Sequence, residues 1–555
     1  MPDTSVATNG SSSGSSSPNM TSSTPPTAST LSFSKDRLPV TILSGFLGSG
    51  KTTLLEYILK DPNHGYKIAV IVNDMAAINI DAAMIGSVVQ RKEDMIQLDN
   101  GCVCCSLRGD LLEEITKLAE SKTYDYLVIE TTGISEPQQV AETFAPEFAD
   151  MHLQAAEDIR ADVEEQSRKT GQKRDEGKLK MAEILADGGL PKISRLDTMV
   201  TVVDSVSIFN DFATADFLSD RHGADEVGDD ERNVSDLMVD QIEFSDVIIL
   251  NKTDLVSKKD LEKVKSLVKT LNPDAEILTS VRSRIDLKKI LNTHRFSFEK
   301  SVMSAGWLKS LREEIKPESD EYNIGSFVYK ARRPFHPLRL WEAIKDRMVV
   351  IQDSYEPEDE MDVDGDESGS DASDDSWESE PDLDAQPQLD PAARLRSKKA
   401  CPAFGPLLRS KGFFWLATRP VMSGEWSQAG VMLTIGAGSR WLCETDESQW
   451  PEHPEIRKKM RADFDPNTPW GDRRQEMVFI GENISTIRPL LTAELDKALL
   501  DDQEWAQWQK IMKSRKTSIK RKVEKLQELF EDGFEDWLDQ EDPEVQAQMH
   551  EGHGH

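Results

Sequence analysis

The sequence predicts an α/β domain built on a mostly parallel sheet, followed by a smaller α+β domain. In the first half of the chain, short runs of β-branched and other apolar residues alternate with helix-length segments, which is the pattern of buried parallel strands joined by helices. These runs are PVTIL (39–43), KIAVIV (67–72), DYLVI (125–129), TMVTVV (198–203) and DVIIL (246–250). Later segments with strand-like alternation, such as GSFVYKARRPF (325–335) and EMVFIG (476–481), predict the second domain.

Changes in composition set the expected domain boundaries. Ser, Thr, Pro, Asn and Gly dominate the first 36 residues, so this segment is expected to be a disordered tail. The other boundaries that we predict are a first domain at 37–300 with a charged insertion at about 154–190, a second domain at 320–500 with an acidic disordered insertion at about 352–398, and a charged helical tail with a His-rich end at 501–555.

The overall charge argues against several classes of partner. The formal net charge is −34, and seventeen acids without a single Lys or Arg lie between Asp353 and Asp390. Neither nucleic acid nor an anionic membrane is therefore an expected partner. We also expect no transmembrane helix, because no run of about 18 apolar residues is present. Five clustered cysteines do not resemble the disulfide framework of a secreted protein, so we expect a cytoplasmic location, with the nucleus as the alternative.

The strongest motif is GFLGSGKT, Gly45 to Thr52, which follows the first apolar run and precedes the helix-like TLLEYILK. Its glycines let successive backbone N–H groups turn toward phosphate oxygens. Lys51 adds a cation to the β- and γ-phosphates, and the hydroxyl of Thr52 is a ligand for Mg²⁺. The first domain is therefore predicted to be a P-loop domain that binds a nucleoside triphosphate.

The NKTD motif, Asn251 to Asp254, follows the run VIIL and predicts that the base is guanine. A carboxylate placed edge-on accepts two N–H donors of guanine, whereas adenine presents an acceptor there. GTP is therefore expected in preference to ATP.

The segment LVIETTGISEP (127–137) supplies a third nucleotide-binding element. Glu130 ends an apolar run, at the position where P-loop enzymes hold Mg²⁺ or its water, and the backbone N–H of Gly133 is placed to sense the γ-phosphate. Ile134 stands where a glutamine would orient the attacking water, so slow intrinsic hydrolysis is predicted. Lys51, Thr52 and Glu130 are the catalytic candidates.

GCVCCSLRGD (101–110) gathers three of the five cysteines, Cys102, Cys104 and Cys105. By themselves these residues allow three interpretations. They form an open Zn²⁺ site with thiolate ligands, a redox pair with the C-x-x-C spacing of Cys102 and Cys105, or a group of buried structural thiols.

With these elements in this order, the chain resembles the CobW family of P-loop metal-handling GTPases. The segments that carry the resemblance in the first domain are NDMAAINID (73–81), QLDNGCVCCSLRGDL (97–111), VIETTGISEP (128–137), RLDTMVTVVD (195–204) and NKTDL (251–255). Those that resemble the family's C-terminal domain are RRPFHPLRLW (332–341), KGFFWLATRP (411–420) and GDRRQEMVFIG (471–481). The resemblance extends over about residues 38 to 500, less the insertions.

The resemblance implies a GTPase domain, a smaller α+β CobW C-terminal domain, and a role in delivering metal, most often zinc and sometimes cobalt. The residues it implies for GTP and Mg²⁺ are Gly45, Gly48, Ser49, Gly50, Lys51, Thr52, Thr53, Asn251, Lys252 and Asp254, to which the segment 127–137 adds Gly133. It also implies Cys102, Cys104 and Cys105 as metal ligands. Family members often carry N-E-F-G-E where this chain has NDMAA (73–77), so one carboxylate is replaced by Ala77. Asp74 is the favoured partner of the thiolates, ahead of Asp81.

The leading functional hypothesis is a GTP-hydrolysing metallochaperone that passes Zn²⁺ to a client metalloenzyme through its C-terminal domain. The cysteines lie in sequence between two candidate switch segments, so GTP is expected to favour metal holding and hydrolysis to favour release. The alternatives are a metal-sensing or buffering GTPase switch, and an assembly factor for a cobalt or corrinoid enzyme. The client is not identifiable, and a monomer and a homodimer both stay open. The C-terminal histidines, His550, His553 and His555, are interpreted equally well as a weak metal-collecting tail and as a solvated terminus.

Overall fold

The structure is a computed structural model, which describes most of both predicted domains. The described residues are 37–72, 95–97, 114–119, 121–133, 137–145, 149–170, 173–174, 176–214, 216, 233–302, 305, 324–352, 390–450 and 454–537. The predicted disordered tail at 1–36, the acidic run and the His-rich end lie outside these residues.

The first domain is built on a seven-stranded sheet with the strand order β3-β2-β4-β1-β5-β6-β7. Its strands are β1 (Leu38–Ser44), β2 (Ile68–Val72), β3 (Met95–Gln97), β4 (Tyr126–Glu130), β5 (Ser194–Asp204), β6 (Val247–Asn251) and β7 (Glu276–Thr279). Every pair of neighbouring strands is parallel. The predicted mostly parallel sheet is therefore confirmed, and the five apolar runs form β1, β2, β4, β5 and β6.

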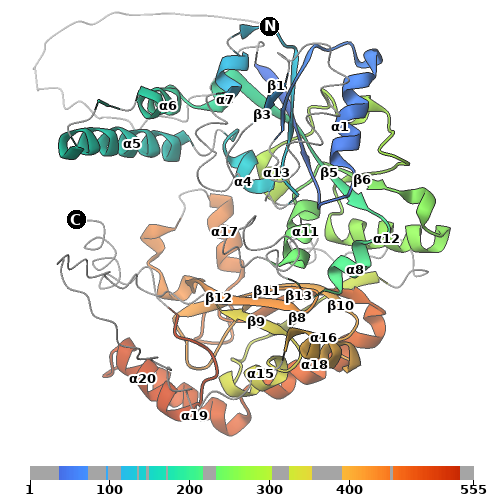
Figure 1. Ribbon diagram of the computed structural model, residues 1–555. Coiled ribbons are helices and arrows are strands. Elements are labelled where there is room, and N and C mark those ends of the chain that lie inside the picture. The colour runs from blue at the N-terminus through green and yellow to red at the C-terminus, as the bar shows by residue number, and fades with distance from the viewer. Residues whose placement is uncertain are drawn as a thin grey trace, which may run out of the picture.

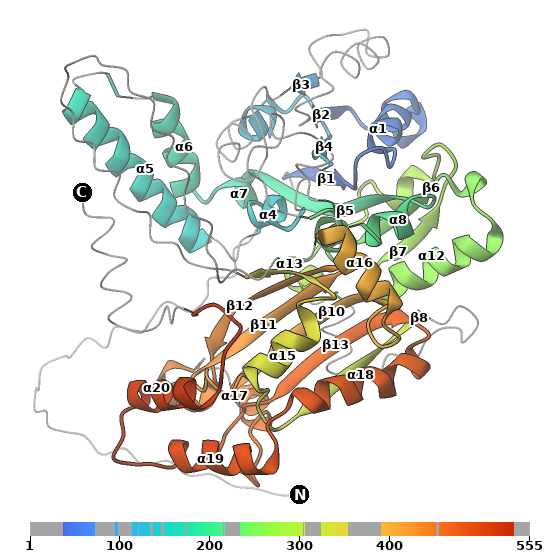
Figure 2. The same ribbon diagram turned by 60° about the horizontal axis from the view of Figure 1, so that its bottom comes forward.

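Helices connect these strands and cover both faces of the sheet (Figure 1). The α-helices are α1 (Lys51–Lys60), α4 (Pro137–Glu142), α5 (Ala149–Thr170), α6 (Glu176–Ala186), α7 (Leu190–Ile193), α8 (Ile208–Phe212), α11 (Val234–Glu243), α12 (Lys258–Leu271) and α13 (Phe298–Val302). Short 3₁₀ turns are η1 (Pro62–His64), η3 (Thr253–Leu255) and η4 (Leu287–Lys289). The charged insertion forms α5 and α6, which lie side by side at the edge of the domain (Figure 2).

The second domain is an α+β unit with a six-stranded sheet in the order β8-β13-β10-β11-β12-β9. Its strands are β8 (Ile324–Ala331), β9 (Val349–Gln352), β10 (Leu407–Phe414), β11 (Met422–Ala429), β12 (Met432–Arg440) and β13 (Gln475–Glu482). The pairing is antiparallel except where β9 joins β12. Helices α15 (Pro337–Ile344) and α18 (Ile484–Ala498) pack together beneath this sheet (Figure 2).

Two expected boundaries differ from the structure. Helix α16 (Pro391–Ala400) begins inside the range of about 352–398 that was assigned to the disordered insertion, so that range extends too far toward the C-terminus. The other helices of this region are α17 (Pro454–Ala462), α19 (Asp502–Met512) and α20 (Ile519–Leu529), with 3₁₀ turns η5 (Leu442–Glu444) and η6 (Glu447–Gln449).

The second difference is the expected boundary at residue 500. Trp508 of α19 and Leu526 of α20 share one buried cluster with Trp415, so this boundary divides a continuous core.

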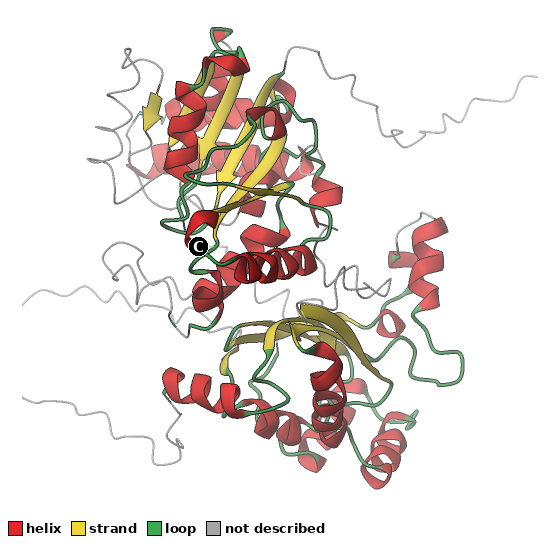
Figure 3. Ribbon diagram, turned by 90° about the vertical axis from the view of Figure 1, so that its right-hand side faces the viewer, coloured by secondary structure: helices red, strands yellow, loops and turns green. Residues whose placement is uncertain are grey.

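A single apolar core joins the two domains. It contains residues of α8, α11, α12 and β6 together with Ile324, Ala429, Val478 and Ile480 from the second sheet. Figure 3 shows the two sheets with helices of the first domain between them. The face of the second sheet opposite α15 and α18 is therefore covered by the first domain.

Candidate nucleotide-binding site

The candidate site lies at the carboxyl ends of the parallel strands, where ligands of open α/β sheets bind. The loop from Gly45 to Gly50 follows β1 and leads into α1. Gly45 has φ +133° and Gly50 has φ +109°, a region that favours glycine. A Cβ on Gly45 would lie 2.2 Å from the carbonyl oxygen of Val202, and one on Gly50 would lie 2.4 Å from Nδ2 of Asn251. Gly45 and Gly50 are therefore required by close neighbours as well as by backbone conformation.

Lys51 stands at the first position of α1 with only 7% of its surface exposed. Its Nζ donates hydrogen bonds to the carbonyl oxygens of Gly45 at 2.7 Å and Phe46 at 3.4 Å. The ammonium group is thus held across the loop, on the side where the phosphates of a bound nucleotide would be expected.

Thr52 and Glu130 are brought together because β1 and β4 are adjacent and Leu43 pairs with Glu130. The Oγ1 of Thr52 donates a 2.8 Å hydrogen bond to Oε1 of Glu130, which is 5% exposed. A hydroxyl and a carboxylate are the hard oxygen ligands that Mg²⁺ prefers, and Mg²⁺ usually uses one or two carboxylates together with phosphates and water. These residues fit a Mg²⁺ ion that is completed by the nucleotide.

Asn251 links the guanine motif to the phosphate loop. Its side chain is 2% exposed, and its Nδ2 donates to the carbonyl oxygen of Ser49 at 2.9 Å and to Oγ of Ser283 at 3.0 Å. Its Oδ1 accepts from the backbone N–H of Ser283 at 2.9 Å and from Oγ of Ser280 at 3.0 Å. Ser280 and Ser283 were not singled out from the sequence. They follow β7, the strand next to β6, and that position is the signal that could have found them.

The other residues of the guanine motif are half-buried, except for the exposed Asp254. Lys252 adopts a left-handed conformation with φ +58°, and its Nζ forms a 2.6 Å ion pair with Oδ2 of Asp204 at the end of β5. Asp254 is exposed in η3, where its carboxylate is accessible to an incoming base. Asp204 is a third residue that was not assigned to the site from the sequence, although it directly follows the run TMVTVV.

Gly133 lies against the phosphate loop. A Cβ at this position would lie 2.4 Å from Cγ of Leu47. Its carbonyl oxygen accepts a 3.2 Å hydrogen bond from Nε2 of Gln241, a residue of α11 that is 1% exposed. Gln241 belongs to no motif in the sequence, and only its contact with Gly133 in the folded chain identifies it as a residue of the site.

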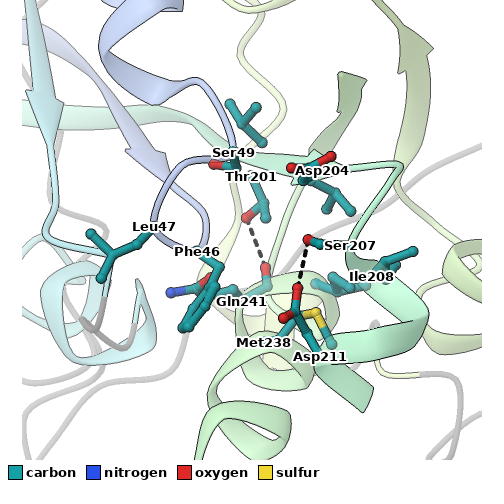
Figure 4. Close-up of a pocket in the computed structure, with 13 residues that line it drawn as sticks. Phe46, Leu47, Ser49, Thr201, Asp204, Ser207, Ile208, Asp211, Met238 and Gln241 are labelled. Atoms are coloured by element: carbon teal, nitrogen blue, oxygen red, sulfur yellow. Dashed lines mark hydrogen bonds between the residues drawn. The ribbon is translucent and has the colours of Figure 1, made fainter. Parts of the chain in front are cut away.

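A small pocket opens between the phosphate loop, the end of β5, and helices α8 and α11 (Figure 4). Phe46 and Leu47 line it from the loop, and Gln241 lines it from α11. Among the lining residues, Thr201 donates a hydrogen bond to the carbonyl oxygen of Gln241, and Ser207 donates one to Asp211. The pocket shows that α11 borders the phosphate loop directly.

The predicted metal ligands Cys102, Cys104, Cys105 and Asp74, and the alternative Asp81, lie outside the described residues. Within the described ranges, no group of three or more His, Cys, Asp and Glu side chains is arranged to hold a metal ion.

The two cysteines of the second domain, Cys401 and Cys443, are half-buried free thiols. The Sγ of Cys443 accepts a 2.8 Å hydrogen bond from Arg473, and burial raises the pKa of this thiol to about 12. Cys443 is therefore a protonated, packed side chain at neutral pH.

Among the helices that the structure describes, none is long and apolar enough to cross a membrane.

Comparisons with known proteins agree over both domains. The family model for the CobW/HypB/UreG nucleotide-binding domain matches residues 39–182 and 176–279, and that for the cobalamin synthesis protein cobW C-terminal domain matches residues 383–499. The zinc-regulated GTPase metalloprotein activator 1 of Dictyostelium discoideum is 37% identical over 493 residues, covering 85% of this chain and 83% of that protein. A zinc chaperone CobW from a Sinorhizobium species is 26% identical, covering 56% of this chain and 77% of its own length. The solved structure of Zn(II)-bound YjiA GTPase from E. coli is 18% identical with a TM-score of 0.30, covering 84% of this chain and 99% of that chain.

Proposed function

Because the chain belongs to the CobW family of P-loop GTPases, we propose that it is a metallochaperone that binds Zn²⁺ and delivers it to a client metalloenzyme under control of GTP hydrolysis. The observation that carries the nucleotide part is the buried link from Asn251 to Ser49, which joins the guanine motif to the phosphate loop. The zinc part is supported by the relatives, which are named as a zinc-regulated activator and a zinc chaperone.

In the proposed nucleotide site, the loop from Gly45 to Thr53 holds the phosphates and Asp254 recognises guanine. Thr52 and Glu130 hold Mg²⁺ directly or through its water, and the ion neutralises charge on the β- and γ-phosphates when bound. Lys51 moves its ammonium from the loop carbonyls to the phosphate oxygens. Water then attacks the γ-phosphorus, the bond to the β–γ bridging oxygen breaks, GDP keeps the electron pair, and both protons of the water leave with the phosphate as H₂PO₄⁻.

Zinc is the cargo in this proposal. Cys102, Cys104 and Cys105 are the proposed source of its thiolate ligands, with Asp74 as the oxygen ligand. Thiolates favour Zn²⁺ over Mg²⁺ or Ca²⁺, and a site that keeps one position open can exchange its ion. The second domain is the proposed surface for the client, and the proposed location is the cytosol, where thiols stay reduced.

The central test measures zinc affinity of the full-length chain in two nucleotide states by competition with a chromophoric chelator. We expect affinity with Mg²⁺ and a non-hydrolysable GTP analogue to exceed affinity with GDP by about tenfold, within the usual range of coupling between two sites. Equal affinity in the two states would refute the coupling.

Cysteine variants test the site itself. Replacing Cys102, Cys104 and Cys105 with Ser should abolish tight zinc binding and leave GDP affinity unchanged. Replacing Cys401 and Cys443 with Ser is the matched control and should leave zinc affinity unchanged. Zinc binding that survives the triple replacement would show that the ligands lie elsewhere.

A transfer experiment separates the chaperone from its alternatives. Lys51→Ala is expected to arrest hydrolysis, so proteins captured with this variant and analysed for metal identify candidate clients. Zinc transfer to the apo form of such a client should require GTP hydrolysis. Transfer without hydrolysis, or none at all, would favour a sensing or buffering switch, and preferential transfer of Co²⁺ would favour a cobalt-enzyme assembly factor.

A further inference from the structure

Helix α11 (Val234–Glu243) lies between the nucleotide edge of the first sheet and the second domain (Figure 1). Its polar residues fall on two sides. Asp236, Asp240 and Glu243 are spaced i, i+4 and i+7, so they share one face. Gln241 lies about 140° around the helix axis from Asp236, because each residue advances by about 100°.

The side of α11 that carries Gln241 contacts the nucleotide edge. Its Nε2 donates to the carbonyl oxygen of Gly133 at 3.2 Å. Its backbone carbonyl accepts hydrogen bonds from Thr201 at 2.8 Å and Ser245 at 2.6 Å. The Oγ1 of Thr201 is in turn 2.7 Å from Oγ of Ser44, the last residue of β1 before the phosphate loop. Gln241 is therefore linked by hydrogen bonds to the segments that carry the site.

The opposite side of α11 contacts Arg409 of β10, which is 1% exposed. Its guanidinium lies 3.3 Å from Asp236, 3.5 Å from Glu243 and 3.9 Å from Asp240. It also donates to Oγ of Ser427 at 3.0 Å, on the neighbouring strand β11. A buried arginine surrounded by three carboxylates strongly resists displacement, because moving it away would leave buried charges uncompensated.

Close packing surrounds this ionic contact. Met238, Val239 and Ile242 of α11 belong to the apolar core that includes residues of β11 and β13. Gly430, in the turn between β11 and β12, has φ +59°, and a Cβ there would lie 2.3 Å from the carbonyl oxygen of Phe212 in α8. The Oγ of Ser235 donates to the carbonyl oxygen of Asp211 at 2.9 Å, which ties α11 to α8. One side of helix α11 thus packs closely against the second domain.

We propose that Gln241 is a positioning residue for GTP hydrolysis that acts through Gly133, and that Arg409 of the second domain sets its position by fixing α11. This inference rests on the nucleotide site proposed above and on the role expected from the sequence for the N–H of Gly133, which is to sense the γ-phosphate. The peptide group that follows Gly133 is held by Gln241 at its oxygen, so the orientation of this loop depends on where α11 stands. A client that shifts the second sheet would move α11 and change the rate of hydrolysis.

The test compares Gln241→Met and Arg409→Lys in the full-length chain, measuring kcat, KM for GTP and the dissociation constant of GDP. Gln241→Met removes the donor with little change of volume. We expect kcat to fall by about tenfold, as for one hydrogen bond lost from the transition state, and GDP affinity to stay within about twofold. Arg409→Lys keeps the charge, loses the geometry of the guanidinium, and should lower kcat by about threefold.

The double variant provides the critical comparison. If Arg409 acts through Gln241, the double variant should be no slower than Gln241→Met alone, because coupled residues are not additive. Losses that multiply, or a kcat for Gln241→Met within about twofold of the parent chain, would overturn the proposal. Failure of the parent chain to bind GTP would instead refute the proposed function, so the two failures are distinct.

Matched controls separate positioning from stability. Gln475→Met removes a buried amide of β13 that donates to the carbonyl oxygens of Arg333 and Trp415, and Arg419→Lys alters a buried arginine paired with Asp532. Both should lower the melting temperature and leave kcat unchanged. Gln241→Asn, which keeps the amide but shortens its reach, replaces Gln241→Met if that variant does not fold, and the same loss of kcat is expected. A normal kcat in Gln241→Asn would contradict the proposal.

Discussion

Replacing Asn251 with Ala tests whether the guanine motif and the phosphate loop act as one unit. The side chain makes four hydrogen bonds at 2.9–3.0 Å, to the Ser49 carbonyl, to the Ser280 hydroxyl and to both the N–H and the hydroxyl of Ser283. At about 1 kcal/mol net for each bond, and with the Ser283 hydroxyl keeping its bond to the Gly50 carbonyl, the substitution should cost about 3 kcal/mol of stability.

The same substitution should also weaken GDP binding. Without Asn251, binding must realign two loops that are aligned in advance in the parent chain. A realignment cost of about 1.4 to 2.8 kcal/mol corresponds to a loss of about 10- to 100-fold in affinity. Equilibrium titration with a fluorescent GDP analogue measures this loss, and urea denaturation measures the stability.

Asn272→Ala is the matched control for this prediction. Asn272 is also fully buried in the first domain, and its Nδ2 donates to the carbonyl oxygens of Ile242, Glu243 and Ser245. This variant should lose a similar amount of stability and keep GDP affinity within about twofold, since it touches neither loop. If Asn251→Ala binds GDP as tightly as Asn272→Ala does, the reasoning about the linked loops is wrong.

Three further predictions concern Mg²⁺, pH and the second core. Glu130→Gln should keep the fold and weaken Mg²⁺-dependent GTP binding by about tenfold, seen as a higher Mg²⁺ requirement in a hydrolysis assay. Burial opposes ionisation of Asp197, but hydrogen bonds from Arg195, Tyr126 and neighbouring groups outweigh it and lower its pKa. The ionised Asp197 therefore stabilises the fold above the unfolded-state pKa of about 3.9, and this stabilisation is lost as pH falls through the lower folded-state pKa. In melting scans from pH 5 to 2, acid should accordingly destabilise the parent chain more than the Asp197→Asn variant. Trp508→Ala should cost about 3 to 5 kcal/mol in urea denaturation, and a smaller loss would contradict its place in the core.

The first sheet could be predicted from the sequence because its five central strands are long enough and apolar enough to stand out. The strands β3 and β7 were not predicted from the sequence, each for its own reason. The run at Met95–Gln97 is only three residues long, and β7 is a half-buried edge strand without a clean apolar pattern. The motif residues were found because backbone chemistry at a phosphate demands a fixed local spacing. Ser283 and Gln241 were missed because their roles come from contacts across 32 and 108 residues of sequence.

The second domain's relation to the first could not be predicted from the chain, and it changes the meaning of α11. In the sequence, VSDLMVDQIE is an amphipathic segment whose acids would face water in an isolated domain. In the structure those acids surround the buried Arg409, and Glu243 is itself buried there. Carboxylates paired with a single buried arginine gain little stability over an apolar contact, but they allow only one register between the partners. The interface therefore holds α11 in one defined position. On the side of α11 that faces away from Arg409, Gln241 contacts the loop at Gly133, which is expected to move when GTP is hydrolysed.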